Sequence, residues 1–294
     1  MILNKRIPIT YWFNIIKKEL LFVTFFSTVI FYLTKYFVDL NIPISIGAFL
    51  ITAISLLLSF KLSQSYDRWW EARKIWGEIV NDSRSLVLQI KNFSKEGNDS
   101  TIERMALRQI AWSYSLSQSL RNKNAIVNLE SFISEDEIFA YKNHKNVPLA
   151  ILDHQSKDLS QLHHKNAIND YQQIQIDNTL IKLCAAMGKA ERIKNTAFPK
   201  TYRHTLYFFI FITLISLSFS LSEMMSIVEV PFMIIISIPF FLLDKIAENI
   251  QDPFENKPND TAMTSISRTI EINIKQLNYK DIPEPIKPEN FYIL

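Results

Sequence analysis

A run without a single charged residue, from Pro43 to Phe60, constrains this chain more than any other feature. A helix needs about 20 mostly apolar residues to cross the hydrocarbon core of a bilayer, and the run reaches that length when it is extended to Leu62. It leads directly into Ser65–Gly77, a segment with paired tryptophans and charges of both signs. We therefore predict a membrane helix that enters water through an aromatic and charged junction.

The predicted helix has one distinct face. At about 100° per residue, an arc of roughly 100° collects hydroxyl and bulky apolar side chains at Ser45, Phe49, Thr52, Leu56, Ser59, Phe60 and Ser63. Small hydroxyl residues let membrane helices approach closely, which favours a helix–helix seam. The alternative interpretation is the lining of a pore, and the residues alone leave both open.

Apolar length predicts four membrane spans in two hairpins: Leu20–Val38, Pro43–Leu62, Thr205–Met225 and Ile227–Leu243. The linkers Asp39–Ile42 and Glu223–Ser226 contain no Lys or Arg, whereas the segment before the first span has four. By the positive-inside rule, both termini and the region between the hairpins lie in the cytoplasm. No small-residue cleavage site follows the basic start, so we expect an uncleaved segment.

The spans divide the chain into five parts. We expect a cytosolic segment at 1–19, a transmembrane hairpin at 20–62, a cytosolic helical domain at 63–204, a second hairpin at 205–243 and a cytosolic C-terminal segment at 244–294. The middle part is predicted to be helical because apolar residues recur at helical spacing, as at Trp76, Ile79, Leu86, Ile90, Ile110 and Ala111. Prolines after Lys280 predict an extended tail. With only four glycines and one cysteine, the expected fold is an all-α membrane protein without disulfides.

Several functions are not indicated by the residues. The net charge of +3 is small and no Gly-rich phosphate loop accompanies it, so no nucleic-acid or nucleotide partner is expected. The histidines between 144 and 164 match no zinc spacing, and no catalytic motif is present. We expect no enzyme, no metal site and no cofactor, and a lipid bilayer as the first partner.

Three separated motifs, in the same order, resemble the bestrophin ion-channel family, specifically its bacterial branch. The first is Ser65–Arg73, which includes Arg68, Trp69, Trp70, Glu71 and Arg73; the others are Ala190–Pro199, and Asp244–Phe254 with its Pro253 and Phe254. The resemblance covers nearly the whole chain. It implies a homopentamer in the bacterial inner membrane, whose second spans line a central pore for small monovalent ions.

The resemblance also implies where the pore is narrow. By distance from Arg68, the family's hydrophobic neck falls on Thr52, Leu56 and Phe60, which lie on the face already described. Thr52 departs from the bulky apolar residue that the family favours there, so the outer end of the neck is expected to be wider or wetter. A second, cytosolic constriction falls near Thr179 when residues are counted back from Arg192, or at Ile176 or Leu180 if the register differs.

A second departure concerns calcium. Animal members follow the Pro-Phe pair with consecutive acidic residues that bind calcium, whereas this chain reads Glu255, Asn256, Lys257, Pro258, Asn259 and Asp260. A lysine opposes the six to eight oxygen ligands that calcium takes. We therefore predict no calcium activation of the animal kind.

The sign of the permeant ion is not set by the neck, which carries no formal charge. Animal members are best known for conducting anions, whereas resemblance to the bacterial branch implies that cations can pass, so we expect cations such as sodium by a small margin over chloride. Two other classes stay open. A secondary transporter would show inverted repeats and charged midplane residues, and a membrane-anchored scaffold or signalling protein would act through its cytosolic helices.

Overall fold

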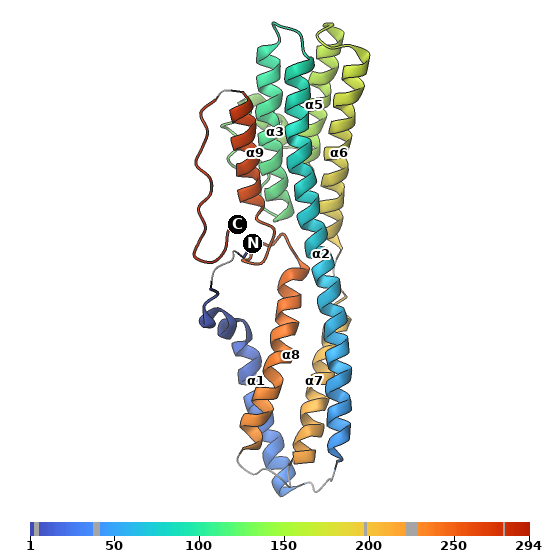
Figure 1. The fold of residues 1–294 in the computed structure, drawn as a ribbon, viewed down its shortest axis with the longest axis vertical. Coiled ribbons are helices and arrows are strands. Elements are labelled where there is room, and N and C mark those ends of the chain that lie inside the picture. Colours follow the sequence, from blue (N-terminus) through green and yellow to red (C-terminus); the bar gives the residue numbers. More distant parts are fainter. Residues whose placement is uncertain (3–5, 38–41, 197–198, 222–227, 279) are drawn as a thin grey trace. The chain divides into compact units, whose positions relative to one another are not determined.

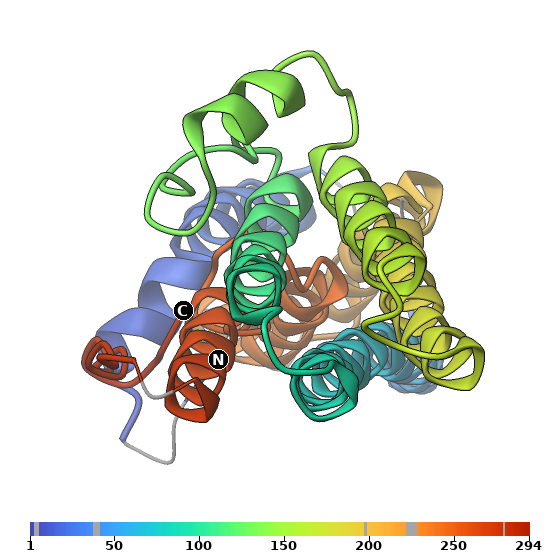
Figure 2. The same ribbon diagram turned by 90° about the horizontal axis from the view of Figure 1, so that it is seen from above.

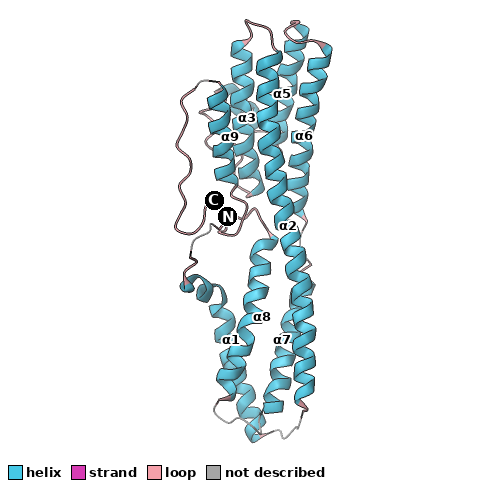
Figure 3. Ribbon diagram, viewed as in Figure 1, coloured by secondary structure: helices cyan, strands magenta, loops and turns pink. Residues whose placement is uncertain are grey.

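The computed structural model describes the chain except residues 3–5, 38–41, 197–198, 222–227 and 279. The described residues are mostly helical (Figure 3). The helices follow in the order α1 (Ile9–Tyr36), α2 (Ile44–Phe93), α3 (Asp99–Leu120), α4 (Glu135–Tyr141), α5 (Val147–His164), α6 (Asp170–Asn195), α7 (Lys200–Leu221), α8 (Glu229–Gln251) and α9 (Met263–Leu277), as labelled in Figure 1. Both predicted linkers between spans include residues outside the described part, as do the ends of the first and third spans and the start of the fourth.

The chain divides into two compact units. The first, here the helical unit, contains Trp69–Thr196 and Asp252–Leu294, together with the first residues of the chain. The second, here the apolar unit, contains α1, α2 as far as Arg68, α7, and α8 to Gln251. Helix α2 contributes to both, with 50 residues in one uninterrupted helix.

The apolar unit is built from long helices with apolar side chains on most of their surface. Helix α8 packs against α1 and α7, and α1 also contacts α7 (Figure 1). Its buried core includes Val23, Ile54, Leu214 and Phe241. Three of the described helices, α2, α7 and α8, are long and apolar enough to cross a membrane. Helix α1 exposes large apolar side chains such as Leu21, which is 73% exposed, and its crossing remains a prediction.

Helix α8 continues through both of its prolines. Pro231 lies in the first turn, where backbone N–H groups have no partner within the helix. Pro239 lies inside the helix, and such prolines are tolerated where neighbouring groups compensate the lost hydrogen bond. The backbone of α8 is therefore helical on both sides of each proline.

The helical unit is a bundle around one core. Helix α3 packs against α5, α6 and α9 (Figure 2), and α5 against α6. The second half of α2 contributes Trp76, Ile79, Leu86 and Ile90, all 0–2% exposed, and Trp112 of α3 is fully buried in the same core. The helical spacing in the sequence thus predicted the buried face of α2 correctly.

The end of the chain is extended, as the prolines predicted, from Lys280 to Pro288. It returns to the start of α9, where the backbone N–H of Ser265 donates to the carbonyl of Leu294 at 2.9 Å.

Candidate pore and junction

The three residues predicted to form the neck lie on the exposed face of α2 in the apolar unit. Leu56 and Phe60 are 58% and 56% exposed, and Thr52 is exposed with its hydroxyl donating to the carbonyl of Ala48 at 3.0 Å. In a single subunit, a side chain that lines a pore between subunits has to be exposed in this way. The hydroxyl of Thr52 is already hydrogen-bonded to its own helix, so this position presents a methyl and a satisfied oxygen.

The opposite face of α2 is buried. Ile54 and Leu58 are 0% and 2% exposed and belong to the core with α7 and α8. Gly47 lies on this face as well, where an added Cβ would lie 3.6 Å from Leu217 Cδ1. Tyr202 of α7 donates its hydroxyl to the carbonyl of Leu57 at 2.8 Å. The helix therefore has one packed face and one face left free, and the neck residues occupy the free face.

Two residues of the paired-tryptophan motif, Arg68 and Trp69, donate side-chain hydrogen bonds to backbone carbonyls. Arg68 Nε donates to the carbonyl of Gln251 at the end of α8, at 3.0 Å. Trp69 Nε1 donates to the carbonyl of Asn259 at 2.8 Å. Trp70 stacks on Trp69 with ring centroids 6.1 Å apart and is itself 46% exposed. The motif thus fastens α2 to the end of α8 and to the loop that follows it.

Within the helical unit, α2 and α6 are joined by surface ion pairs. Glu71 pairs with Arg192 at 2.5 Å, and Glu78 pairs with Lys189 at 3.0 Å. Arg73 is half-buried. The first of these pairs connects the first and second motifs of the sequence, but exposed pairs of this kind stabilise a fold by only about 0–1 kcal/mol.

The loop after α8 is anchored by its Pro-Phe pair. Phe254 is fully buried in the core of the helical unit. The carbonyl of Pro253 accepts the backbone N–H of Thr261 at 3.0 Å, which closes the loop. Asp260 is 1% exposed, and its Oδ2 accepts the backbone N–H of Lys257 at 3.0 Å.

The same loop fits calcium poorly. The Glu255 carboxylate is paired with Lys257 Nζ at 2.5 Å, so the lysine takes up one of the charges that a metal would need. In this described loop, the buried side-chain oxygens without a hydrogen-bond partner are Asn259 Oδ1, Asp260 Oδ1 and Thr261 Oγ1, of which one is a carboxylate oxygen. Calcium takes six to eight oxygens, several of them from carboxylates. Among the described residues, no group of three His, Cys, Asp or Glu side chains is placed to hold a metal ion.

Burial changes the acidity of Asp260. Desolvation raises the pKa of its carboxyl to about 6, although the Lys257 backbone N–H and ammonium act to lower it. The charges of Arg121 and of the Met1 amine also interact with this carboxylate. The loop therefore contains an acid that titrates near neutral pH in the folded protein.

The residues expected to form the cytosolic constriction are buried in the structure. Thr179 is 4% exposed and donates its hydroxyl to Gln89 Oε1 at 2.8 Å, and Ile176 and Leu180 are 0% and 5% exposed in the core. Side chains enclosed in the core of one subunit cannot close a pore between subunits. Counting back from Arg192 located a position along α6 but not a face of it, and this helix exposes large apolar side chains at Tyr171, Ile174 and Ile181.

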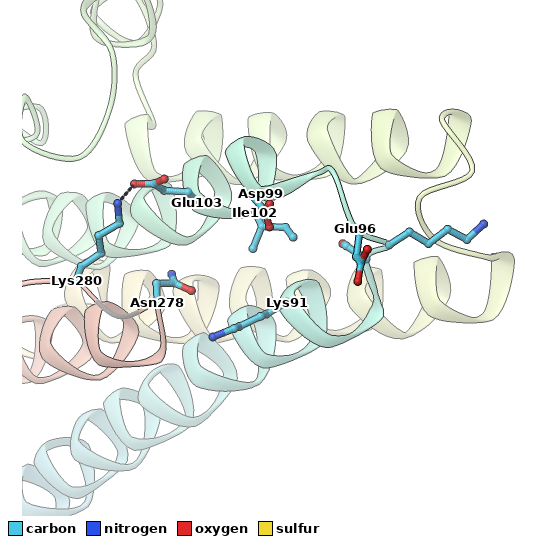
Figure 4. A pocket seen from close by; sticks show the side chains of 9 residues that line it. Lys91, Glu96, Asp99, Ile102, Glu103, Asn278 and Lys280 are labelled. Carbon is cyan, nitrogen blue, oxygen red and sulfur yellow. Dashed lines mark ion pairs between the residues drawn. The ribbon is translucent and has the colours of Figure 1, made fainter.

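A hollow of about 350 Å³ lies at the turn between α2 and α3 (Figure 4). Its lysines, Lys91, Lys95 and Lys280, lie among acidic side chains. Lys280 pairs with Glu103 at 2.8 Å, and Lys91 donates to the carbonyl of Leu277. The charges in this hollow compensate one another, so it does not present a site for an anion.

Sequence reasoning missed two buried charged groups. Arg108 pairs with Glu137 and with Asp158, the latter at 2.6 Å, inside the helical unit. Lys61 pairs with Asp244 inside the apolar unit. No local pattern indicates either contact, because the partners are far apart in the sequence. Arg108 is 29 residues from Glu137 and 50 from Asp158, and Lys61 is 183 residues from Asp244.

Comparison with known proteins gives one consistent result. The family model described as bacterial/fungal bestrophin protein matches residues 13–276. The voltage-dependent anion channel-forming protein YneE of Escherichia coli K12 is 27% identical over 285 residues, covering 95% of this chain and 92% of that protein. The voltage-dependent anion channel-forming protein alr2987 of Nostoc is 30% identical over 247 residues, covering 81% and 80%.

The solved structures agree. A bacterial bestrophin homologue from Klebsiella pneumoniae has a TM-score of 0.83 at 25% identity, covering 90% of this chain and 99% of that one. The crystal structure of a membrane protein variant has a TM-score of 0.84, also at 25% identity, covering 91% of this chain and 100% of that one. The likeness in fold therefore extends over most of the chain.

Proposed function

This chain belongs to the bacterial/fungal bestrophin family, a family of ion channels, and we propose that it forms a homopentamer whose α2 helices line a pore for monovalent ions. The family assignment makes it a membrane channel protein and not an enzyme. The neck at Thr52, Leu56 and Phe60, the pentamer and the four crossings are our proposals. The observation that carries the proposed pore is the exposure of this one face of a helix whose other face is packed; the four crossings rest on apolar length, and the pentamer rests on the resemblance to the family.

A ring of exposed Leu56 and Phe60 side chains would make an apolar constriction. Such a constriction gates by dewetting, because water leaves a narrow apolar passage and an ion cannot cross without its hydration. Thr52, whose hydroxyl is held by Ala48, would form the wider outer ring. The proposed closed state of the channel is therefore a dry segment about one helical turn long, from position 56 to position 60.

The second constriction is proposed on the exposed face of α6. Tyr171 is 85% exposed, and Ile174 and Ile181 are 59% and 56% exposed, on the same helix as the buried Thr179. Replacing Tyr171 with alanine should then raise the conductance of a channel whose neck is open, whereas Thr179→Ala should act through stability alone.

Location and ion sign complete the proposal. The basic residues before the first predicted span, which starts at Leu20, support cytoplasmic termini and insertion in the bacterial inner membrane. The resemblance to the bacterial branch favoured cations slightly, but the relatives are named as anion channel-forming proteins. That name weighs towards anions, since the neck itself is uncharged. The loop after α8 supports a channel without calcium activation, because Lys257 neutralises Glu255.

The test is a planar-bilayer recording of the purified protein under an asymmetric salt gradient, with its oligomeric mass measured in the same detergent. We expect five copies and a discrete current whose reversal potential gives the sign of the ion. A monomer or dimer, or a folded pentamer without current, would support a transporter or a membrane-anchored scaffold and overturn the channel.

A further inference from the structure

The strongest unused feature of the apolar unit is an ion pair enclosed behind the proposed neck. Lys61 follows Phe60 directly on α2, and its Nζ lies 2.5 Å from Asp244 Oδ1 on α8. The two side chains are 1% and 0% exposed. We propose that this pair is a positioning device that fixes the rotation of α2 about its axis and thereby aims Leu56 and Phe60 at the pore.

The helical geometry puts the pair on the correct side for this role. At about 100° per residue, Lys61 lies roughly 140° around α2 from Leu56 and roughly 180° from Thr52. Its neighbour Phe60 is offset from it by about 100°. Ser65, one turn further along and fully buried, lies on the same side as Lys61. The side of α2 that faces α8 is thus turned away from the side that carries the neck.

A second contact repeats the same register. Arg68 donates to the carbonyl of Gln251, which is seven residues beyond Asp244, as Arg68 is seven residues beyond Lys61. Because both contacts join positions 183 apart, α2 and α8 run parallel in fixed register over two turns. A rotation of α2 by one residue, about 100°, would break both contacts and carry Phe60 away from its present direction.

Stability is a poor reason for the pair. Within the described part of the chain, Asp244 Oδ2 and Ser65 Oγ are buried without a hydrogen-bond partner, so the polar groups of this seam are only partly satisfied. Buried ion pairs replaced by apolar residues of similar size are often neutral or more stable, whereas their best-attested role is to specify register. The core face of α2 offers Ile54 and Leu58, apolar side chains that could pack in more than one rotation.

The inference rests on the proposed pore, so its test has to separate the two. Cysteines are introduced one at a time at Leu56, Phe60, Ile54 and Leu58 in a Cys184→Ser background, since Cys184 is exposed. The rate of modification by a charged, water-soluble thiol reagent is measured for each while the channel conducts, because the proposed neck is dry only in the closed state. The same four positions are then measured with Lys61→Met and Asp244→Leu together, and with the exchanged pair Lys61→Asp and Asp244→Lys. The control double variant is Glu78→Leu and Lys189→Met, which removes an exposed pair of the helical unit.

With the native pair, we expect positions 56 and 60 to react at least tenfold faster than 54 and 58. The apolar double variant should lose most of that difference at unchanged oligomeric mass, and the exchanged pair and the control should retain it. An undiminished difference in the apolar variant overturns the positioning role and leaves the pore intact. If the apolar double variant does not assemble, the variant with the exchanged pair provides the test. An exchanged-pair variant that assembles but reacts equally fast at all four positions also overturns the positioning role. Equal rates at all four positions with the native pair would instead overturn the pore face.

Discussion

Asp260 gives a quantitative prediction about the loop after α8. The pKa of its carboxyl is raised from 3.8 to about 6 by desolvation in a site where it is 1% exposed. Each pKa unit corresponds to about 1.4 kcal/mol, so the difference amounts to about 3 kcal/mol. Between pH 4 and pH 6 the unfolded chain has already released this proton and the folded chain still holds it. Stability therefore falls as pH rises through this window, and the loss is complete above about pH 6.

The substitution Asp260→Asn should remove this loss. Asparagine has the shape of the protonated carboxyl, and its oxygen can still accept the Lys257 backbone N–H that Asp260 accepts now. We expect the variant to exceed the native protein by only about 1 kcal/mol at pH 4.5 and by about 3 kcal/mol at pH 8. For a unit of this size about 2–4 °C accompanies each kcal/mol, so Tm should rise by roughly 6–12 °C.

The assay is thermal unfolding of the detergent-solubilised protein at pH 4.5, 6 and 8, followed by tryptophan fluorescence. Asp281→Asn, in the exposed tail, is the matched control and should leave Tm unchanged at each pH. A variant that differs from the native protein equally at all three pH values, or that is less stable at pH 8, would refute the reasoning.

Further predictions concern the core, calcium and the cytosolic constriction. Arg108→Met should destabilise the helical unit by up to about 3–5 kcal/mol, because it removes the partner that the half-buried Glu137 and the buried Asp158 share and leaves Asp158 with Arg104. Arg192→Met, in an exposed pair, should cost no more than about 1 kcal/mol in the same denaturant titration. Calcium titration of the channel current should show no steep submicromolar response, and such a response abolished by Glu255→Gln or Asp260→Asn would contradict the prediction. In a Phe60→Ala background, Tyr171→Ala should raise the conductance, whereas Thr179→Ala should lower Tm without changing the conductance. The reverse pattern would support the constriction at Thr179 that the sequence predicted.

Local periodicity predicted most of the helices and the two faces of α2. A membrane helix shows its length through an apolar run, and a helix in a soluble bundle shows its buried face through the spacing of residues such as Trp76 and Ile79. The 3.6-residue period separates Leu56 and Phe60 from Ile54 and Leu58, but only the fold shows that the first pair is exposed and the second buried. Periodicity could not show that the apolar first part of α2 and its polar second part form one continuous helix. The apolar pattern changes where the helix passes from lipid to water, although the helical backbone continues.

Contacts between distant segments could not be predicted in this way. In the sequence, Lys61 is a charged residue near the end of a predicted span. Only the fold shows that it is buried and paired with Asp244. Glu137 caps the start of α4 through its contact with Ser134, and its carboxylate also pairs with Arg108. The burial of Thr179 escaped prediction for a related reason, because a count along the chain does not distinguish the packed face of α6 from its free one.

The most direct test of the neck is the single-channel conductance of Phe60→Ala and Leu56→Ala beside Leu21→Ala, which removes another exposed apolar side chain, this one from α1. If α2 lines a dewetted constriction, both neck variants should conduct more, or stay open longer, than the native protein, and Leu21→Ala should not differ from it. Unchanged currents in both neck variants, with five copies confirmed by mass, would contradict the assignment of this face of α2 to the pore.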